Sequence, residues 1–280
     1  MITLYYSNLD SPSIDDIKRD IELHTPSRIV FLCETEWEYH HLNETLADLV
    51  NLHNIQVIVT FCTFPSKFYS ERTHYFNNIK IDYWPTYWVN WTMMCAGQLN
   101  FNIEYTTFDY PFICLNNKNH THRCALIDEL TRNNLLDIGI VTWHRFPKES
   151  PSSTRYHFKY YDDSLRLIDD NFNTLLDSFL IPEQYHKSFL HVIGEVTVEL
   201  VCLSEKTWLP ILYKKPFLIL GMQGIHQYLV DLGFELYDEI IDYSFDNEPD
   251  MQQRAYAISE NVKRISEQNV NDLYQLIKPK

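Results

Sequence analysis

The first hundred residues alternate short apolar runs with stretches of helical periodicity. Three runs rich in β-branched and aromatic residues predict buried strands, at 2–7, 28–34 and 55–62. Between them, residues 13–24 and 41–53 carry apolar side chains at helical spacing, and Ser13 with Asp16 has the pattern of a capping box. This strand–helix alternation predicts a parallel sheet covered by helices.

The following stretch, 64–109, is aromatic and has no clear period, and we expect it to complete the first domain and to contribute acceptor contacts. A second alternating series then begins. It predicts strands at 110–116, 138–144, 189–196 and 216–220, and helices at 122–133, after Lys206, and at 224–233, where Gly233 is a plausible cap. The tail from 249 to 277 is helical and amphipathic.

These patterns predict an α/β fold of two Rossmann-like, doubly wound domains that face a cleft. The expected domains are 1–109 on the acceptor side and 110–262 on the nucleotide side, with a C-terminal helix in 263–280 crossing between them. A chain of 280 residues is long enough for two such cores. In folds of this kind ligands bind where the strands end and the helices begin.

Composition narrows the possible partners. The formal net charge of −15 argues against binding to a nucleic-acid polymer, which depends on clustered Lys and Arg. No window approaches about 18 uninterrupted apolar residues, and the N-terminus has no basic leader, so we expect no membrane span and a cytoplasmic protein. A virus-encoded enzyme that acts in the host cytoplasm fits the same pattern. The six cysteines form no CxxC pair and are expected to be reduced core residues.

One segment of the second domain combines a strand end with a helix start. Glu195 ends the strand, and Ser204, Glu205 and Lys206 open the helix. The first N–H groups of a helix and its positive dipole end favour an anion, and a neighbouring lysine adds a full charge for a diphosphate. A carboxylate such as Glu205 can accept both hydroxyls of a ribose. The alternative is that Ser204 and Glu205 only cap the helix while Lys206 is solvated.

Arg123 opens the preceding predicted helix, just after the strand at 110–116. A guanidinium at a helix N-terminus can hold phosphate oxygens through two parallel hydrogen bonds. The alternative role for Arg123 is a surface salt bridge. The neighbouring His120 and His122 could add donors to the same site.

Together, the two segments resemble the donor-binding domain of the α-1,3-fucosyltransferases and related glycosyltransferases of GT-B architecture. In that family a strand ends in Glu, a Thr-Glu-Lys triplet opens a helix, and a Pro-containing strand ends at Gly. An earlier block has an Arg that opens a helix with an apolar-Asp-x-Leu pattern. The corresponding residues here are Glu195, Ser204–Lys206, Lys215–Gly221, and Arg123 with Asp128 and Leu130. The resemblance covers about residues 110–262, and 232–258 also resembles the tail of related phage and bacterial sequences.

The resemblance implies transfer of a sugar from a nucleotide-diphosphate sugar to a glycan or other hydroxyl acceptor, by an inverting, metal-independent reaction without a further cofactor. The donor-binding residues that it implies are Arg123, Glu195, Thr197, Ser204, Glu205 and Lys206. The family has Asn-Ser after the first Glu, whereas this chain has Val196-Thr197. GDP-fucose is therefore one option for the donor, and UDP sugars are another.

An inverting transferase needs a base that accepts the proton of the acceptor hydroxyl. In the fucosyltransferases this base is a Glu of the N-terminal domain, but no block of that domain aligns here. Glu34 and Glu36 are the first candidates, because they follow a predicted strand and should lie at the rim of the cleft. Asp82 and His74 are further candidates, and for each acidic residue a solvated loop charge is the alternative.

Other functions leave weaker patterns in the sequence. The carboxylates Asp238, Glu239, Asp242 and Asp246 suggest a metal site, but their spacing does not match an EF-hand loop, and a solvated acidic turn is the favoured interpretation. A kinase, NTPase, flavin or nicotinamide enzyme is disfavoured because neither GxxxxGK[ST] nor GxGxxG occurs among six glycines. A non-catalytic carbohydrate- or nucleotide-binding module that keeps the fold is the alternative hypothesis.

Overall fold

The computed structural model describes residues 2–7, 12–33, 42–61, 74–83, 103–116, 119–143, 156–161, 181, 183–199 and 202–277. The chain divides into two compact units, Met1–Met94 and Cys95–Lys280. The sequence pattern placed this boundary before residue 110. Within the described ranges, none of the helices has the length and apolar character needed to cross a membrane.

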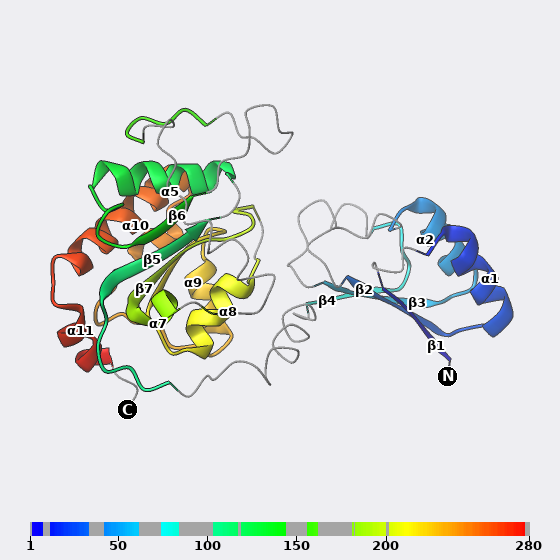
Figure 1. Ribbon diagram of the computed structural model, residues 1–280. Coiled ribbons are helices and arrows are strands. Elements are labelled where there is room, and N and C mark those ends of the chain that lie inside the picture. The colour runs from blue at the N-terminus through cyan, green and yellow to red at the C-terminus, as the bar shows by residue number, and fades with distance from the viewer. Residues whose placement is uncertain are drawn as a thin grey trace. The chain divides into compact units, whose positions relative to one another are not determined.

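The first unit contains a parallel four-stranded sheet with the order β1-β2-β3-β4. Its strands are β1 (Thr3–Ser7), β2 (Arg28–Cys33), β3 (Gln56–Phe61) and β4 (Ile79–Tyr83), and its helices are α1 (Ile14–His24) and α2 (Glu44–Leu52). Each connection steps to the next strand in the same direction, so right-handed crossovers place both helices on one face, as Figure 1 shows. Apolar side chains of α1 and α2 pack there against β2 and β3.

The predicted strands and helices of this unit are confirmed to within a few residues, including the capping box. The Ser13 side chain accepts a hydrogen bond from the Asp16 backbone N–H (3.1 Å), and the Asp16 carboxylate accepts one from the Ser13 N–H (3.1 Å). Strand β4 was not predicted, because its five residues lie inside the aromatic stretch from 64 to 109.

The second unit contains another parallel sheet, with the order β6-β5-β7-β8. Its strands are β5 (Tyr110–Asn116), β6 (Ile140–Trp143), β7 (Ser188–Gly194) and β8 (Phe217–Leu220). The helices are α5 (Thr121–Arg132), α7 (Glu183–Lys187), α8 (Glu205–Leu212), α9 (Ile225–Asp231), the 3-10 turn η2 (Ser244–Asn247), α10 (Met251–Ser266) and α11 (Val270–Ile277). All the strands and long helices predicted for this unit are present, and Gly233 follows α9 with a left-handed φ of 92°.

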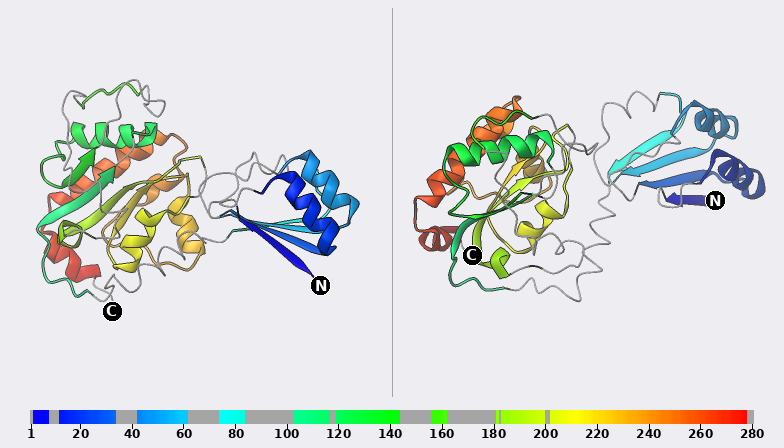
Figure 2. Two further views of the ribbon diagram at one scale, coloured as in Figure 1. Left: turned by 45° about the vertical axis from the view of Figure 1, so that its right-hand side comes forward. Right: turned by 45° about the horizontal axis from the view of Figure 1, so that its top comes forward.

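The direction of the crossovers changes between β5 and β7. Helix α5 connects β5 to β6 on one side, whereas α8 connects β7 to β8 on the other side. The right-handed rule therefore places these helices on opposite faces of the sheet. Figures 1 and 2 show α5 beside α10 on one face, with α8 on the other. A change of this kind leaves a crevice at the carboxyl ends of the two strands.

The C-terminal helices complete the hydrophobic core of the second unit. The apolar faces of α10 and α11 pack with β5, β7 and β8, and Leu273 and Tyr274 of α11 are buried in the same cluster. The Asn271 side chain accepts a hydrogen bond from the Phe108 N–H (2.7 Å), which links α11 to the segment that leads into β5.

Candidate functional site

Most of the donor-binding residues predicted from the sequence lie at the switch between β5 and β7. Arg123 belongs to the first turn of α5, Glu195 follows β7, and Ser204 to Lys206 form the start of α8. The positive charges of Arg123 and Lys206 are close enough for each to lower the pKa of His122, although burial is the main cause. The structure thus brings the two predicted cations to one edge of the sheet.

The Arg123 guanidinium binds backbone oxygens of the protein itself. The side chain is buried, and its Nε donates to the Gly194 carbonyl (3.0 Å) while a terminal nitrogen donates to the Glu195 carbonyl (2.9 Å). Arg123 therefore fastens the start of α5 to the end of β7. A phosphate contact of Arg123 stays a prediction beside these backbone contacts.

His122 reinforces the same connection. Burial lowers its pKa to about 3, so the ring is neutral at physiological pH. Its Nε2 lies 2.6 Å from the Glu195 carbonyl oxygen and must carry the proton, because a carbonyl can only accept.

Gly194 leaves the space through which the Arg123 side chain passes. A Cβ at this position would lie 2.7 Å from Arg123 Cγ and 3.1 Å from Asn116 Oδ1. We therefore expect Gly194→Ala to displace the guanidinium and to reduce the free energy of unfolding by about 1–3 kcal/mol, the usual cost of overpacking. Urea denaturation would measure this change, and a variant as stable as the natural protein would contradict the assigned contact.

The Glu195 carboxylate shapes the turn that leads into α8. It is fully buried and accepts hydrogen bonds from the backbone N–H of Val196 (3.1 Å) and Ser204 (3.0 Å) and from the Thr207 hydroxyl. These bonds hold the turn against the end of β7. Glu195 therefore has a structural role in the described site, because both of its carboxylate oxygens accept hydrogen bonds from the protein itself.

The start of α8 carries the accessible charges of the site. Ser204 is the N-cap, as one interpretation of the sequence expected, and its side chain accepts a bond from the Lys206 N–H. Lys206 Nζ lies 2.7 Å from a Glu205 oxygen, and the two side chains are 19% and 13% exposed. Burial lowers the pKa of Lys206, but attraction by Glu205 and Glu195 outweighs it, so the pKa lies above its ordinary value. Lys206 is therefore a partly exposed cation, and its ammonium is paired with Glu205 and with the Ser204 hydroxyl (3.3 Å).

Two asparagines that the sequence analysis did not single out complete the edge. Asn116 ends β5 and Asn119 precedes α5; both are buried, and in each the Oδ1 atom lacks a hydrogen-bond partner among the described residues. The N-cap residue of α5, His120, makes no side-chain capping bond. These buried amide oxygens are acceptors that the described residues leave unpaired, and the first N–H groups of α5 have no side-chain cap. The position of these asparagines after a predicted strand was the available signal.

The remaining predicted residues lie elsewhere. Thr197 is half-buried, and its hydroxyl accepts a bond from the Glu199 N–H (3.1 Å) in a local turn. Asp128 is buried on α5 and accepts backbone bonds from Lys159, Tyr160 and Tyr161, so it anchors a loop. The candidate bases Glu34 and Glu36 lie outside the described residues. The His74 ring contacts the Tyr75 ring at an interplanar angle of 42°, and the backbone of Asp82 belongs to β4.

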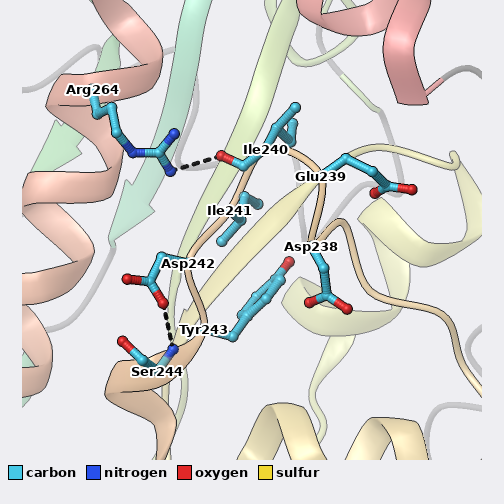
Figure 3. Close-up of a pocket in the computed structure, with 8 residues that line it drawn as sticks. All are labelled: Asp238, Glu239, Ile240, Ile241, Asp242, Tyr243, Ser244 and Arg264. Carbon is cyan, nitrogen blue, oxygen red and sulfur yellow. Dashed lines mark hydrogen bonds between the residues drawn. The ribbon is translucent and has the colours of Figure 1, made fainter.

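The acidic residues after 237 line a separate open recess of about 520 Å³. Its walls include Asp238, Glu239, Asp242 and also Arg264. Figure 3 shows that the three carboxylates point in different directions, with Asp242 bound to the Ser244 N–H (2.9 Å). Asp246 instead lies buried against His226. Within the part of the chain that the structure describes, no three His, Cys, Asp or Glu side chains are grouped to hold a metal ion.

Known proteins add no independent indication of function. A scan against protein-family models finds no family that matches the chain, and searches of curated proteins and of solved structures find no match.

Proposed function

We propose that the second unit binds a nucleotide-diphosphate sugar, and that the protein transfers the sugar to a hydroxyl acceptor. One observation carries this proposal. The starts of α5 and α8 lie at the switch between β5 and β7, and the start of α8 contains Glu205 and Lys206. Switch points of doubly wound sheets bind ligands, and helix starts with a nearby lysine favour phosphate groups.

The residues of this edge suit the different parts of such a donor. Lys206 and the N–H groups at the start of α5 are assigned to the diphosphate. Glu205 is assigned to ribose hydroxyls, and the amide oxygens of Asn116 and Asn119 to sugar hydroxyls. Arg123 is a positioning residue, because its guanidinium binds the carbonyls that end β7.

The reaction builds negative charge on the departing diphosphate. A cation fixed beside that group stabilises the transition state more than the bound substrate, which accelerates the step. Lys206 supplies this charge in the proposed mechanism, without a metal ion. Glu34 and Glu36 are proposed to provide the base in the inverting reaction. GDP and UDP donors both remain candidates.

The alternative proposal is a binding module without catalysis. It is supported by Arg123 and Glu195, because both are engaged in bonds that the fold requires whether or not a reaction occurs. A binding module would retain the sugar nucleotide without releasing nucleoside diphosphate. Turnover of GDP-fucose, GDP-mannose, UDP-glucose, UDP-galactose or UDP-GlcNAc in the presence of glycan acceptors would separate the two proposals.

We expect Lys206→Ala to weaken binding of the preferred sugar nucleotide by roughly tenfold or more, because a charge-assisted bond to phosphate is lost. Titration calorimetry with the same five nucleotides would measure this effect. Lys263→Ala is the matched control, since Lys263 is an exposed lysine on α10 and should not change affinity. Equal affinity in both variants, or no binding of any donor to the natural protein, would refute the proposal.

A further inference from the structure

A small cavity adjoins the start of α8 in the second unit. Its volume is about 40 Å³, and its walls come from α8, β5, β7 and α7. Lys206 belongs to this wall and also to the first turn of α8, which is proposed above to bind the diphosphate. The cavity therefore lies next to the proposed donor site.

Apart from Lys206, the cavity wall is uncharged and mostly apolar. Its aliphatic side chains are those of Ile113, Leu115, Val192, Ile193 and Leu209. The wall also includes Tyr185 and His191, which are both buried. Burial raises the pKa of Tyr185 well above its ordinary value and lowers the pKa of His191 well below its own, so both side chains are neutral. Because Lys206 is already paired with Glu205, the cavity favours a neutral, largely apolar group.

The volume of the cavity limits the size of that group. One water molecule needs about 10–15 Å³ on this measure, so the cavity holds about three water-sized groups. An acetyl group, which consists of a methyl group, a carbonyl carbon and an oxygen, has this size. A single methyl group would leave most of the cavity empty, and a hydroxymethyl group would bring a hydroxyl against aliphatic walls.

We propose that the donor is a nucleotide-diphosphate sugar with a 2-acetamido group, and that the cavity beside Lys206 holds the acetyl part of this group. In such a sugar, carbon 2 is bonded to the anomeric carbon that carries the diphosphate. A substituent on carbon 2 is therefore close to a phosphate bound by Lys206, whereas a substituent on carbon 6 lies beyond the ring oxygen. The acetyl methyl group contacts the aliphatic side chains of Ile113 and Leu209.

This inference rests on the proposed function, because it requires the diphosphate to bind at Lys206. It adds the class of sugar, which the charges at the start of α8 do not determine. Leu209 becomes a specificity-determining residue, since it lines the cavity from the same helix that carries Lys206.

Two matched pairs of donors test the class of sugar. UDP-GlcNAc differs from UDP-glucose only in the acetamido group, and UDP-GalNAc differs from UDP-galactose in the same way. Titration calorimetry with the full chain would give the Kd of each. A small group that fills an apolar pocket typically changes affinity by roughly 10- to 200-fold. We therefore expect the acetamido sugar of at least one pair to bind at least about tenfold more tightly than its hydroxyl partner.

Substitutions of Leu209 test whether the cavity causes this preference. Leu209→Phe should fill the cavity and bring the ratio of the two Kd values close to one. Leu212→Phe is the matched control, because Leu212 is half-buried on the same helix but does not belong to the cavity wall, and it should keep the ratio of the natural protein. Leu209→Ala should enlarge the cavity and favour the N-propanoyl analogue of the sugar over the N-acetyl form. Thermal melting would verify that each variant is folded.

The outcomes separate this inference from the proposed function. If none of the UDP or GDP sugars named above bound to the natural protein, the proposed function would be refuted and the class of sugar with it. If sugar nucleotides bound but both members of each matched pair had equal affinity, only the acetamido proposal would be overturned. An unchanged ratio in Leu209→Phe, or an unchanged preference for the acetyl form in Leu209→Ala, would show that the group binds elsewhere.

Discussion

Arg123→Ala is expected to reduce the free energy of unfolding of the second unit by about 3–5 kcal/mol. The substitution removes a buried side chain that donates to the carbonyls of Gly194 and Glu195. It leaves a cavity and deprives the end of β7 of charged donors. His122 still donates to the Glu195 carbonyl, whereas the Gly194 carbonyl loses the donor that Arg123 supplies. Guanidinium denaturation followed by tryptophan fluorescence would measure the loss.

Arg132→Ala is the matched control on the same helix. Arg132 lies 2.6 Å from Glu129 and from Glu260, but its side chain is 25% exposed. Ion pairs that solvent can reach contribute little to stability, so the expected loss is about 1 kcal/mol or less. If Arg123→Ala proved as stable as the natural protein but no longer bound sugar nucleotide, Arg123 would be a phosphate ligand and the positioning role would be wrong.

Asp246→Ala is expected to destabilise the second unit by a similar amount, about 3–5 kcal/mol. The Asp246 carboxylate accepts His226 Nδ1–H at 2.7 Å and the backbone N–H groups of His226 and Gln227 at 3.0 Å. On the other side of the ring, the Ile219 N–H donates to His226 Nε2 at 3.1 Å. Removing the carboxylate leaves buried donors of α9 unpaired and loosens its attachment to β8. Thermal or urea unfolding would record the difference.

The same carboxylate should make stability depend on pH. Burial raises the pKa of Asp246, but the bonds from His226 and the backbone outweigh burial, so the folded pKa lies below the ordinary value of 3.8. The unfolded state therefore binds the proton first as the pH falls. The stabilisation is complete above pH 3.8 and is lost as the pH falls through the folded pKa.

Asp246→Asn provides the test of this pH dependence, because the amide cannot titrate. Melting temperatures of both proteins from neutral pH to the acid limit should converge as the pH falls below 3.8. If the two curves of melting temperature against pH stayed parallel throughout, Asp246 would not be responsible for the loss of stability at low pH.

The sequence predicted the elements whose side chains are buried on a regular period. Residues 110–116 form β5 with the predicted bounds, because the run is apolar and ends at polar Asn116. Strand β4 was missed because its short alternation in IKIDY is surrounded by aromatic residues without a period. The local hydrophobic pattern therefore predicted a strand where apolar residues recur regularly. It failed for β4, where neighbouring aromatic residues obscure the alternation.

The positions of the candidate-site residues in the fold could be predicted from the sequence, but their hydrogen bonds could not. Strand ends and helix starts indicated where Arg123, Glu195 and Lys206 would lie. The hydrogen-bond partners of Arg123 could not be predicted. Gly194 lies 71 residues after Arg123 in the chain, and every residue has a backbone carbonyl oxygen that could accept the bond. Only the register of β7 beside β5 decides which carbonyl the guanidinium meets.

The packing of α11 sets the order in which the protein can fold during synthesis. The first unit has all its described strands once β4 has emerged from the ribosome, and it can fold while translation continues. The hydrophobic core of the second unit is incomplete until Leu273 and Tyr274 have been added, and these residues follow all of its described strands in the chain. Until then, the apolar surface that these residues cover is exposed to chaperones and to other nascent chains.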